Sequence, residues 1–194
     1  MKLHLKNKTL LICALLTVAF NLIAFCGRDP IKDAKEAMTK GDYKTALIKL
    51  RDAYEERENR KSYEVNFLFA TVFAQLNQQD SAEIYFYKVI NISADSTAPF
   101  VGLAESYEKR NLNTMAIQQY EKAINLDSTN VNIHYKIAKL YRSQRDYKSA
   151  ANSYLQVVKR DTMNTEALTE LADIYSRAKQ PANAARLYKR LSTL

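Results

Sequence analysis

Side chains able to do acid–base, nucleophilic or metal chemistry are few and scattered in this sequence. The 194 residues include two histidines and two cysteines, and His134 is the only one of the four beyond residue 26. A metal site needs further ligands, and neither a Ser-centred elbow nor a glycine-rich phosphate loop is present. His134 also falls midway between Phe100 and Leu168 in an evenly spaced series of positions, which predicts a packing role. We therefore predict no enzyme, no cofactor and no metal.

Phosphate binding is the other chemistry to consider, because the formal net charge is +8. A basic cluster contains Lys136, Lys139, Arg142, Arg145 and Lys148. Acidic residues such as Glu166 and Glu170 follow later in the chain, so the cluster is interpreted as solvated helix faces. Nucleic acid is not an expected partner.

The elements that position these side chains come from an internal repeat, in which the numbers of equivalent positions differ by 34. Two alanine columns keep this interval, namely Ala70, Ala104, Ala138, Ala172 and Ala82, Ala116, Ala150, Ala184. Two aromatic columns keep it as well, namely Phe73, Tyr107, Tyr141, Tyr175 and Phe86, Tyr120, Tyr154, Tyr188. Within a unit the apolar residues recur at helical spacing, which predicts two amphipathic helices joined by a short turn.

An earlier unit is slightly offset, since Ala34 and Ala46 precede Ala70 and Ala82 by 36 rather than 34. No strand-like alternation occurs, so we predict an all-α domain over residues 27–194. The predicted units are 27–60, 63–96, 97–130, 131–164 and 165–194.

The turn residues agree with these units. We expect Gly41, Asn77 and Asn111 to end helices in the left-handed conformation. All three prolines, Pro30, Pro99 and Pro181, fall in the predicted first turn of a helix, with Asp29 and Ser96 as caps.

A helix–turn–helix of this repeat length with these columns resembles the tetratricopeptide repeat. The segments 103–107 and 120–124 carry the resemblance most closely, in Leu103-Ala104-Glu105-Ser106-Tyr107 and Tyr120-Glu121-Lys122-Ala123-Ile124. The usual early tryptophan is replaced by Asn66, Phe100, His134 and Leu168. The resemblance implies a right-handed superhelical solenoid of about five repeats that acts as a non-catalytic protein–protein interaction scaffold.

The resemblance also implies a concave groove lined by the first helix of each unit, which binds a peptide or protein segment. Carried over to this chain, the lining residues are Lys35, Met38, Phe67, Leu68, Thr71, Gln75, Val101, Glu105, Glu108, Tyr135, Lys136, Lys139, Arg142, Thr169, Asp173 and Arg177. The types of these residues predict that the groove lining is apolar in the second repeat, acidic in the third, basic in the fourth and mixed in the fifth. The lysine–asparagine pattern with which some members of the family clamp a C-terminal carboxylate is absent at these positions.

Residues 1–26 have the layout of an export signal. Lys2, Lys6 and Lys8 precede an apolar run that continues to Cys26. Three outcomes stay open: Cys26 is lipidated, as residues 22–26 resemble a lipobox apart from Phe25; the chain is cleaved and begins at Gly27; or the segment is retained as a short anchor. In each case the charge bias places the repeats outside the cytoplasm. The expected location is a bacterial cell envelope, membrane-anchored, with a soluble periplasmic or secreted form as the alternative.

The last predicted helix has no following unit to cover it. Leu187, Tyr188, Leu191 and Leu194 would then leave an apolar edge open, because the end unit of a stack has no neighbour on one side. The alternative function is thus a structural periplasmic homo-oligomer that assembles through this edge.

Overall fold

The computed structural model describes residues 29–194, and every regular element in this range is helical. The expected all-α fold is therefore confirmed. Within the described range no helix has the length and apolar character needed to cross a membrane. The predicted export segment and its lipidation candidate Cys26 lie outside the described residues. The chain divides into two compact units, one ending at Arg60 and one running from Lys61 to Leu194.

The first unit contains α2 (Pro30–Thr39) and α3 (Tyr43–Tyr54), which pack against each other. Their contact is made of small and branched apolar side chains, all fully buried or nearly so: Ala34, Ala37, Ala46, Leu50 and Ala53. The predicted cap Asp29 accepts hydrogen bonds from the N–H groups of Ile31 and Lys32. Asp42 caps α3 in the same way through the N–H of Thr45.

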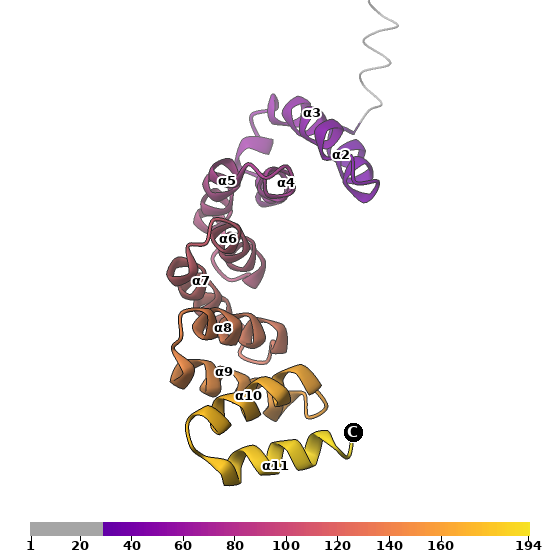
Figure 1. Cartoon of the computed structure of the whole chain (residues 1–194). Helices are drawn as coiled ribbons and strands as arrows, with labels where there is room; N and C mark the ends of the chain where they lie inside the picture. Colours follow the sequence, from indigo (N-terminus) through magenta and orange to yellow (C-terminus); the bar gives the residue numbers. More distant parts are fainter. Residues whose placement is uncertain (1–28) are drawn as a thin grey trace, which may run out of the picture. The chain divides into compact units, whose positions relative to one another are not determined.

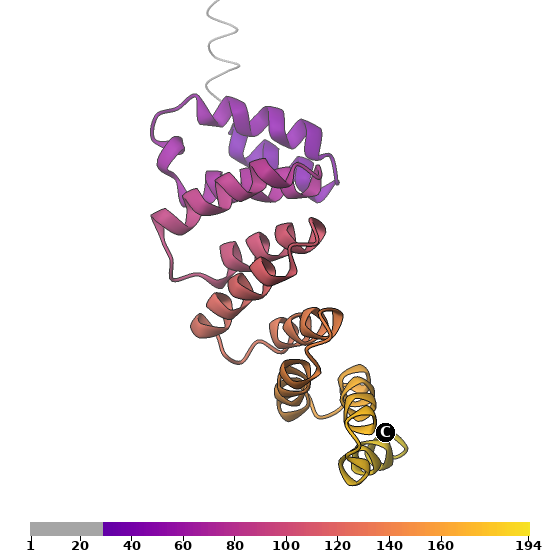
Figure 2. The same ribbon diagram turned by 60° about the vertical axis from the view of Figure 1, so that its left-hand side comes forward.

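The second unit is a stack of four helix pairs. Its helices are α4 (Tyr63–Gln75), α5 (Gln79–Ile92), α6 (Thr97–Lys109), α7 (Asn113–Leu126), α8 (Val131–Ser143), α9 (Tyr147–Arg160), α10 (Thr165–Arg177) and α11 (Pro181–Leu191), preceded by the 3-10 turn η1 (Asn59–Lys61). Each even-numbered helix packs on the odd-numbered one that follows, and α5, α7 and α9 pack on the first helix of the next pair. Figures 1 and 2 show the pairs following one another in chain order.

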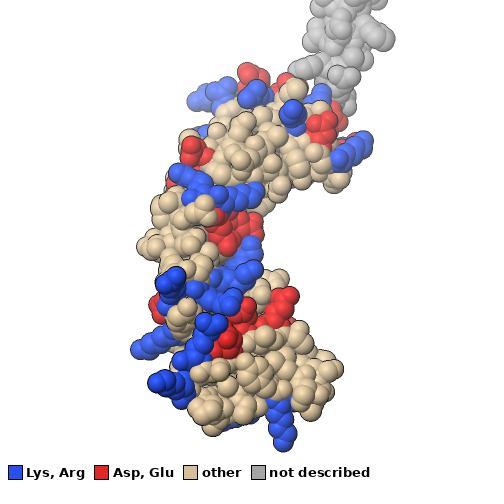
Figure 3. Space-filling view, viewed as in Figure 1, with Lys and Arg blue, Asp and Glu red and all other residues tan. Residues whose placement is uncertain are grey.

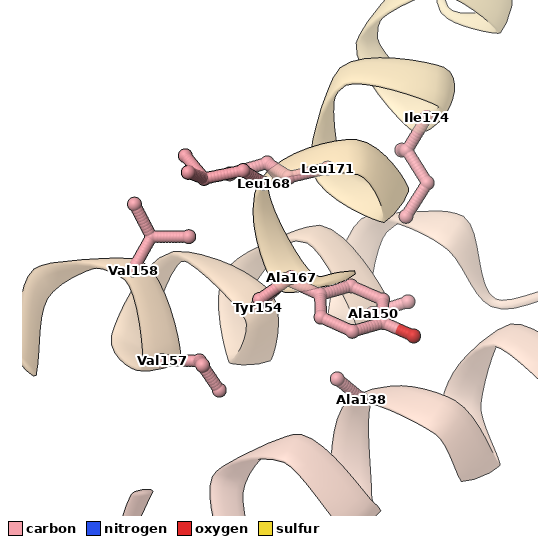
Figure 4. Packing of buried hydrophobic residues seen from close by; sticks show 9 residues of the cluster. All are labelled: Ala138, Ala150, Tyr154, Val157, Val158, Ala167, Leu168, Leu171 and Ile174. Carbon is pink, nitrogen blue, oxygen red and sulfur yellow. The ribbon is translucent and has the colours of Figure 1, made fainter. Parts of the chain in front are cut away.

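The alanine columns lie where the helices approach most closely. All four first-helix alanines and the alanines at 82, 116 and 150 are fully buried. The second aromatic column fills the space between successive pairs, with Phe86 2% exposed and Tyr120 and Tyr154 0%. In Figure 4 the ring of Tyr154 lies between Ala138 and Ala167, with Leu168 and Leu171 on α10. Burying one such side chain contributes about 1.5–3 kcal/mol, so this column supplies much of the stacking energy.

Each helix pair turns through a residue with positive φ. The three predicted positions are confirmed, with φ of 74° at Gly41, 60° at Asn77 and 58° at Asn111. Arg145 (62°) and Lys179 (58°) adopt the same conformation, which the sequence did not suggest because neither is glycine or asparagine. The residue after each turn donates its N–H back to the last helical turn, as Asp146 does to Tyr141 O at 2.9 Å.

The predicted proline positions are also confirmed. Pro30 and Pro181 are the first residues of α2 and α11, and Pro99 is the third of α6. A missing N–H costs little in a first turn, because that group has no partner within the helix. Ser96 caps α6 as expected, accepting from the N–H of Ala98.

Gly102 explains how α5 and α6 come close. A Cβ at this position would overlap the ring of Phe86, which is itself buried. The glycine therefore gives the ring a place against the backbone of α6, at the cost of about 1 kcal/mol in helix propensity.

We predict that Gly102→Ala destabilises the fold. Overpacking costs about 1–3 kcal/mol, which should exceed the roughly 1 kcal/mol gained in helix propensity. The measurement is the free energy of unfolding in urea. In a Phe86→Leu background, where the overlap is relieved, the same substitution should be neutral or stabilising; an equal loss in both backgrounds would contradict the explanation.

Candidate functional site

The first helices of the second unit leave two hollows between them. The first lies between α4 and α6, has a volume of about 440 Å³, and is called here the apolar pocket. The rings of Phe67 and Phe86 meet edge to face at 6.1 Å, and with Val101 and Gly102 they line it. Thr71 lies on the same wall.

A polar rim surrounds this apolar lining. It consists of Gln75, Glu105 and Lys109. The Lys109 ammonium donates to Ala74 O at 3.0 Å, near the C-terminal end of α4, where a positive charge also suits the helix dipole. Phe67, Thr71, Gln75, Val101 and Glu105 were all predicted from the sequence; Phe86, Gly102 and Lys109 were not.

Leu68 was also predicted for the groove, but it is not among the residues that line the apolar pocket. Its side chain is only 9% exposed and belongs to the core. Neighbouring residues of a helix point about 100° apart, which places Leu68 nearer the core than Phe67. Two further predicted residues, Lys35 and Met38, lie on α2 in the first unit, exposed and half-buried respectively.

The second hollow lies between α8 and α10, has a volume of about 430 Å³, and is called here the cationic pocket. Its lining consists of Lys139, Arg142, Ser143, Arg145, Tyr147, Asp173 and Arg177. Lys139, Arg142, Asp173 and Arg177 were predicted. The sequence signal that could have found Arg145 is its alignment with the turn residues Asn77 and Asn111.

Charged side chains pair across neighbouring repeats, so the predicted acidic third and basic fourth segments partly compensate each other. Lys136 on α8 lies 2.7 Å from Glu105 and 3.7 Å from Glu108, both on α6. Arg142 binds Glu170 on α10, with Nη1 donating at 2.9 Å and Nε 2.9 Å from the second oxygen. Figure 3 shows acidic and basic atoms next to one another on this face. Exposed pairs of this kind contribute about 0.2–1 kcal/mol each, so they set register more than stability.

Tyrosine hydroxyls extend this network. Tyr120 donates to Glu108 at 2.5 Å, and Tyr135 to Glu166 at 2.8 Å. Burial, reinforced by the adjacent carboxylates, raises the pKa of Tyr135 to about 12 and that of Tyr120 well above its usual range. Burial also raises the pKa of Tyr154, whose hydroxyl has no hydrogen-bond acceptor among the described protein atoms.

The reason for this difference is a substitution within the repeat. Arg142 precedes Tyr154 by the same interval at which Glu108 precedes Tyr120. The acceptor of one repeat is thus a cation in the next, because that position is used for the pair with Glu170.

The remaining predicted residues have structural or surface positions. His134 is 8% exposed, and its Nε2 lies 3.0 Å from Ser128 O. Thr169 is exposed on α10 and donates to Thr165 O. Leu187 and Leu191 pack partly against the core cluster around Tyr154, whereas Tyr188 and Leu194 are exposed. No group of three or more His, Cys, Asp or Glu side chains in residues 29–194 is arranged to hold a metal ion.

Stacked helix pairs with binding-sized hollows between their first helices define an α-helical repeat protein. Family models for one repeat match it in three places: a TPR repeat model over residues 104–144, and tetratricopeptide repeat models over 135–192 and 63–96. The chain is a tetratricopeptide repeat protein.

Solved structures share this fold. A crystal structure of MamA protein matches at 15% identity and a TM-score of 0.73, covering 84% of this chain and 87% of that one. MamA residues 41-end from Desulfovibrio magneticus RS-1 match at 15% identity and 0.71, covering 86% and 96%. YrrB, described as a TPR protein with an unusual peptide-binding site, matches at 14% identity and 0.68, covering 84% and 82%. A comparison with curated proteins found no match.

We predict opposite effects for two equivalent tyrosines. Tyr120→Phe removes a hydrogen bond to a carboxylate and leaves Glu108 with one donor fewer, so it should cost about 1.5–3 kcal/mol in unfolding free energy. Tyr154→Phe removes a hydroxyl without a protein acceptor and should be neutral or stabilising. Urea unfolding of both variants checks this, and equal losses would contradict the assigned network.

Proposed function

We propose that this protein is a non-catalytic scaffold that binds an extended segment of another protein along α4, α6, α8 and α10. The observation that carries the proposal is the apolar pocket between α4 and α6. Its volume lies in the range of about 300–1,000 Å³ that is usual for ligand sites. The tetratricopeptide fold supports the same function, and YrrB is a member of it that is described as having a peptide-binding site.

The pocket suits a large apolar side chain of the partner. Phe67, Phe86 and Val101 would bury it, which supplies affinity in proportion to the apolar area removed from water. The rim residues Gln75, Glu105 and Lys109 could hydrogen-bond to the partner's backbone, which supplies orientation.

The proposed location is the outer side of the cytoplasmic membrane of a bacterium. This part of the proposal rests on Lys2, Lys6, Lys8 and the apolar run that follows them. The intact mass of the protein from host membranes separates a lipidated Cys26 from a chain that begins at Gly27 and from a retained anchor.

A second candidate function is self-association through the C-terminal edge. Tyr188 is 47% exposed, whereas its equivalents Phe86, Tyr120 and Tyr154 are at most 2% exposed because the next helix pair covers them. The equivalent surface is buried in each of the three preceding repeats, so this exposed one is suited to contact with a second copy.

We predict that groove binding depends on Val101. Peptides selected from a random library on the wild-type chain should share an apolar residue and bind Val101→Glu at least tenfold more weakly, a loss of about 1.4 kcal/mol or more. The physical reason is a carboxylate placed in the apolar lining. Fluorescence anisotropy measures the affinity.

Ile84→Glu is the matched control, since Ile84 is 57% exposed on α5 and does not line the pocket. Circular dichroism should show both variants folded. The proposal fails if the selected peptides lack an apolar preference or lose affinity equally for both variants.

We predict that Tyr188→Glu abolishes any self-association of the wild-type chain, because it puts a charge on the exposed apolar edge. Sedimentation velocity over a concentration series measures this, again with Ile84→Glu as control. A wild-type chain that stays monomeric at high micromolar concentration would remove this second candidate.

A further inference from the structure

The two pockets occupy equivalent places in the repeat, and they lie two repeats apart. Thr71, Ala74 and Gln75 of the apolar pocket correspond to Lys139, Arg142 and Ser143 of the cationic pocket, and on the next helix Glu105 and Lys109 correspond to Asp173 and Arg177. The fold therefore offers one hollow twice, with an apolar lining between α4 and α6 and a charged lining between α8 and α10.

The charges of the cationic pocket do not cancel. Arg142 is paired with Glu170, and Arg177 is paired with Asp173 at 2.9 Å. Lys139 and Arg145 have no carboxylate within ion-pair distance among residues 29–194, although the Lys139 ammonium lies over the Tyr135 ring at 5.6 Å. Two positive charges thus remain available at the mouth of a hollow large enough for a side chain.

Arg145 stands in a conformation that other residues would adopt more easily. Its φ of 62° matches that of Asn77 and Asn111, and asparagine tolerates this region better than arginine does. The conformation belongs to the turn of every repeat, so what sets Arg145 apart is its place in the pocket lining without an ion-pair partner. Lys179 has the same conformation without lining the pocket, so it serves as an internal control.

We infer that the cationic pocket binds the carboxylates of acidic residues in the same partner segment whose apolar residue enters the apolar pocket. Lys139 and Arg145 supply the uncompensated charge, and the half-exposed ring and hydroxyl of Tyr147 form part of the wall. The inference rests on the proposed function, because it deepens the description of the ligand of that groove.

The spacing of the two pockets sets the spacing within the ligand. Packed helices lie about 8–10 Å apart. The first helices of successive pairs make few direct contacts with each other, so two repeats along their row span at least about 20 Å. An extended chain advances about 3.3–3.6 Å per residue. The acidic residues should therefore lie at least about six positions from the apolar one.

The test uses the full chain in mild detergent and a fluorescein-labelled peptide. The probe carries one leucine and two glutamates in a Gly/Ser background, at a series of spacings that starts at about six positions. Each spacing is made in both orders. Fluorescence anisotropy should show that replacing both glutamates by glutamine weakens binding at least tenfold. The Lys139→Gln/Arg145→Asn variant should lose a similar factor, because it removes the charge that faces the carboxylates.

Two controls separate binding from folding. Lys179→Asn makes the same relief of backbone strain outside the pocket and should leave probe affinity unchanged. Arg145→Asn alone should raise the Tm or leave it unchanged while weakening the probe at least threefold, which a purely structural arginine would not do.

The outcomes distinguish the two proposals. If a probe with serine in place of leucine still binds in a glutamate-dependent way, the cationic pocket stands and the apolar anchor falls. If binding depends on leucine and Val101 but not on glutamate or Arg145, the apolar anchor stands and the cationic pocket falls. Failure of both probe orders to bind, or displacement of the probe by an equal concentration of inorganic phosphate, would overturn the inference.

Discussion

The close approach of helix backbones at the alanine columns is the constraint on which the second unit depends. A larger side chain at Ala104 or Ala138 would push the two helices of a pair apart, and the pair would no longer present one continuous face to its neighbour. Once the backbones are close, the remaining space is filled by an aromatic ring from the second helix. The residue that faces the Phe86 ring is Gly102, which has no Cβ and leaves room for the ring. The hollows between first helices follow from the same spacing, because the rings hold successive pairs at a fixed separation.

Recognition on such a scaffold comes from side chains that change while the backbone repeats. Glu108 and Arg142 occupy equivalent positions, yet one accepts a hydrogen bond from a buried tyrosine and the other binds a carboxylate of the next pair. In the same way, Lys139 and Arg142 stand where the apolar pocket has Thr71 and Ala74, so an apolar hollow becomes a charged one two repeats later. Because each repeat contacts only its neighbours, a local exchange of this kind leaves the stability of distant repeats almost unchanged. Binding chemistry can therefore vary along the row at little cost to the fold.

Much of the fold could be predicted because its signals are local or strictly periodic. The turn residues Asn77 and Asn111 and the cap Asp29 depend on neighbours in the same helix pair, and the alanine and aromatic columns recur at a fixed interval. The groove was harder, since which side of α4 faces the hollow depends on how the next pair stacks. Leu68, predicted for the groove, is largely buried and does not line the apolar pocket. Pairs such as Lys136 with Glu105 join residues 31 apart and depend on the stacking angle, which no spacing reveals. Arg145 was hidden by its type, because arginine is not expected in a left-handed turn.

The bonds that join one helix pair to the next all bridge a similar stretch of chain. Lys109 reaches Ala74 across 35 residues, Lys136 reaches Glu105 across 31, and Arg142 reaches Glu170 across 28. Contact order in the second unit is therefore low, and adding further pairs would not lengthen the loops that must close during folding. A chain built this way can acquire structure pair by pair, without waiting for a distant segment to arrive. An apolar helix face therefore stays uncovered only until the next pair of helices has formed.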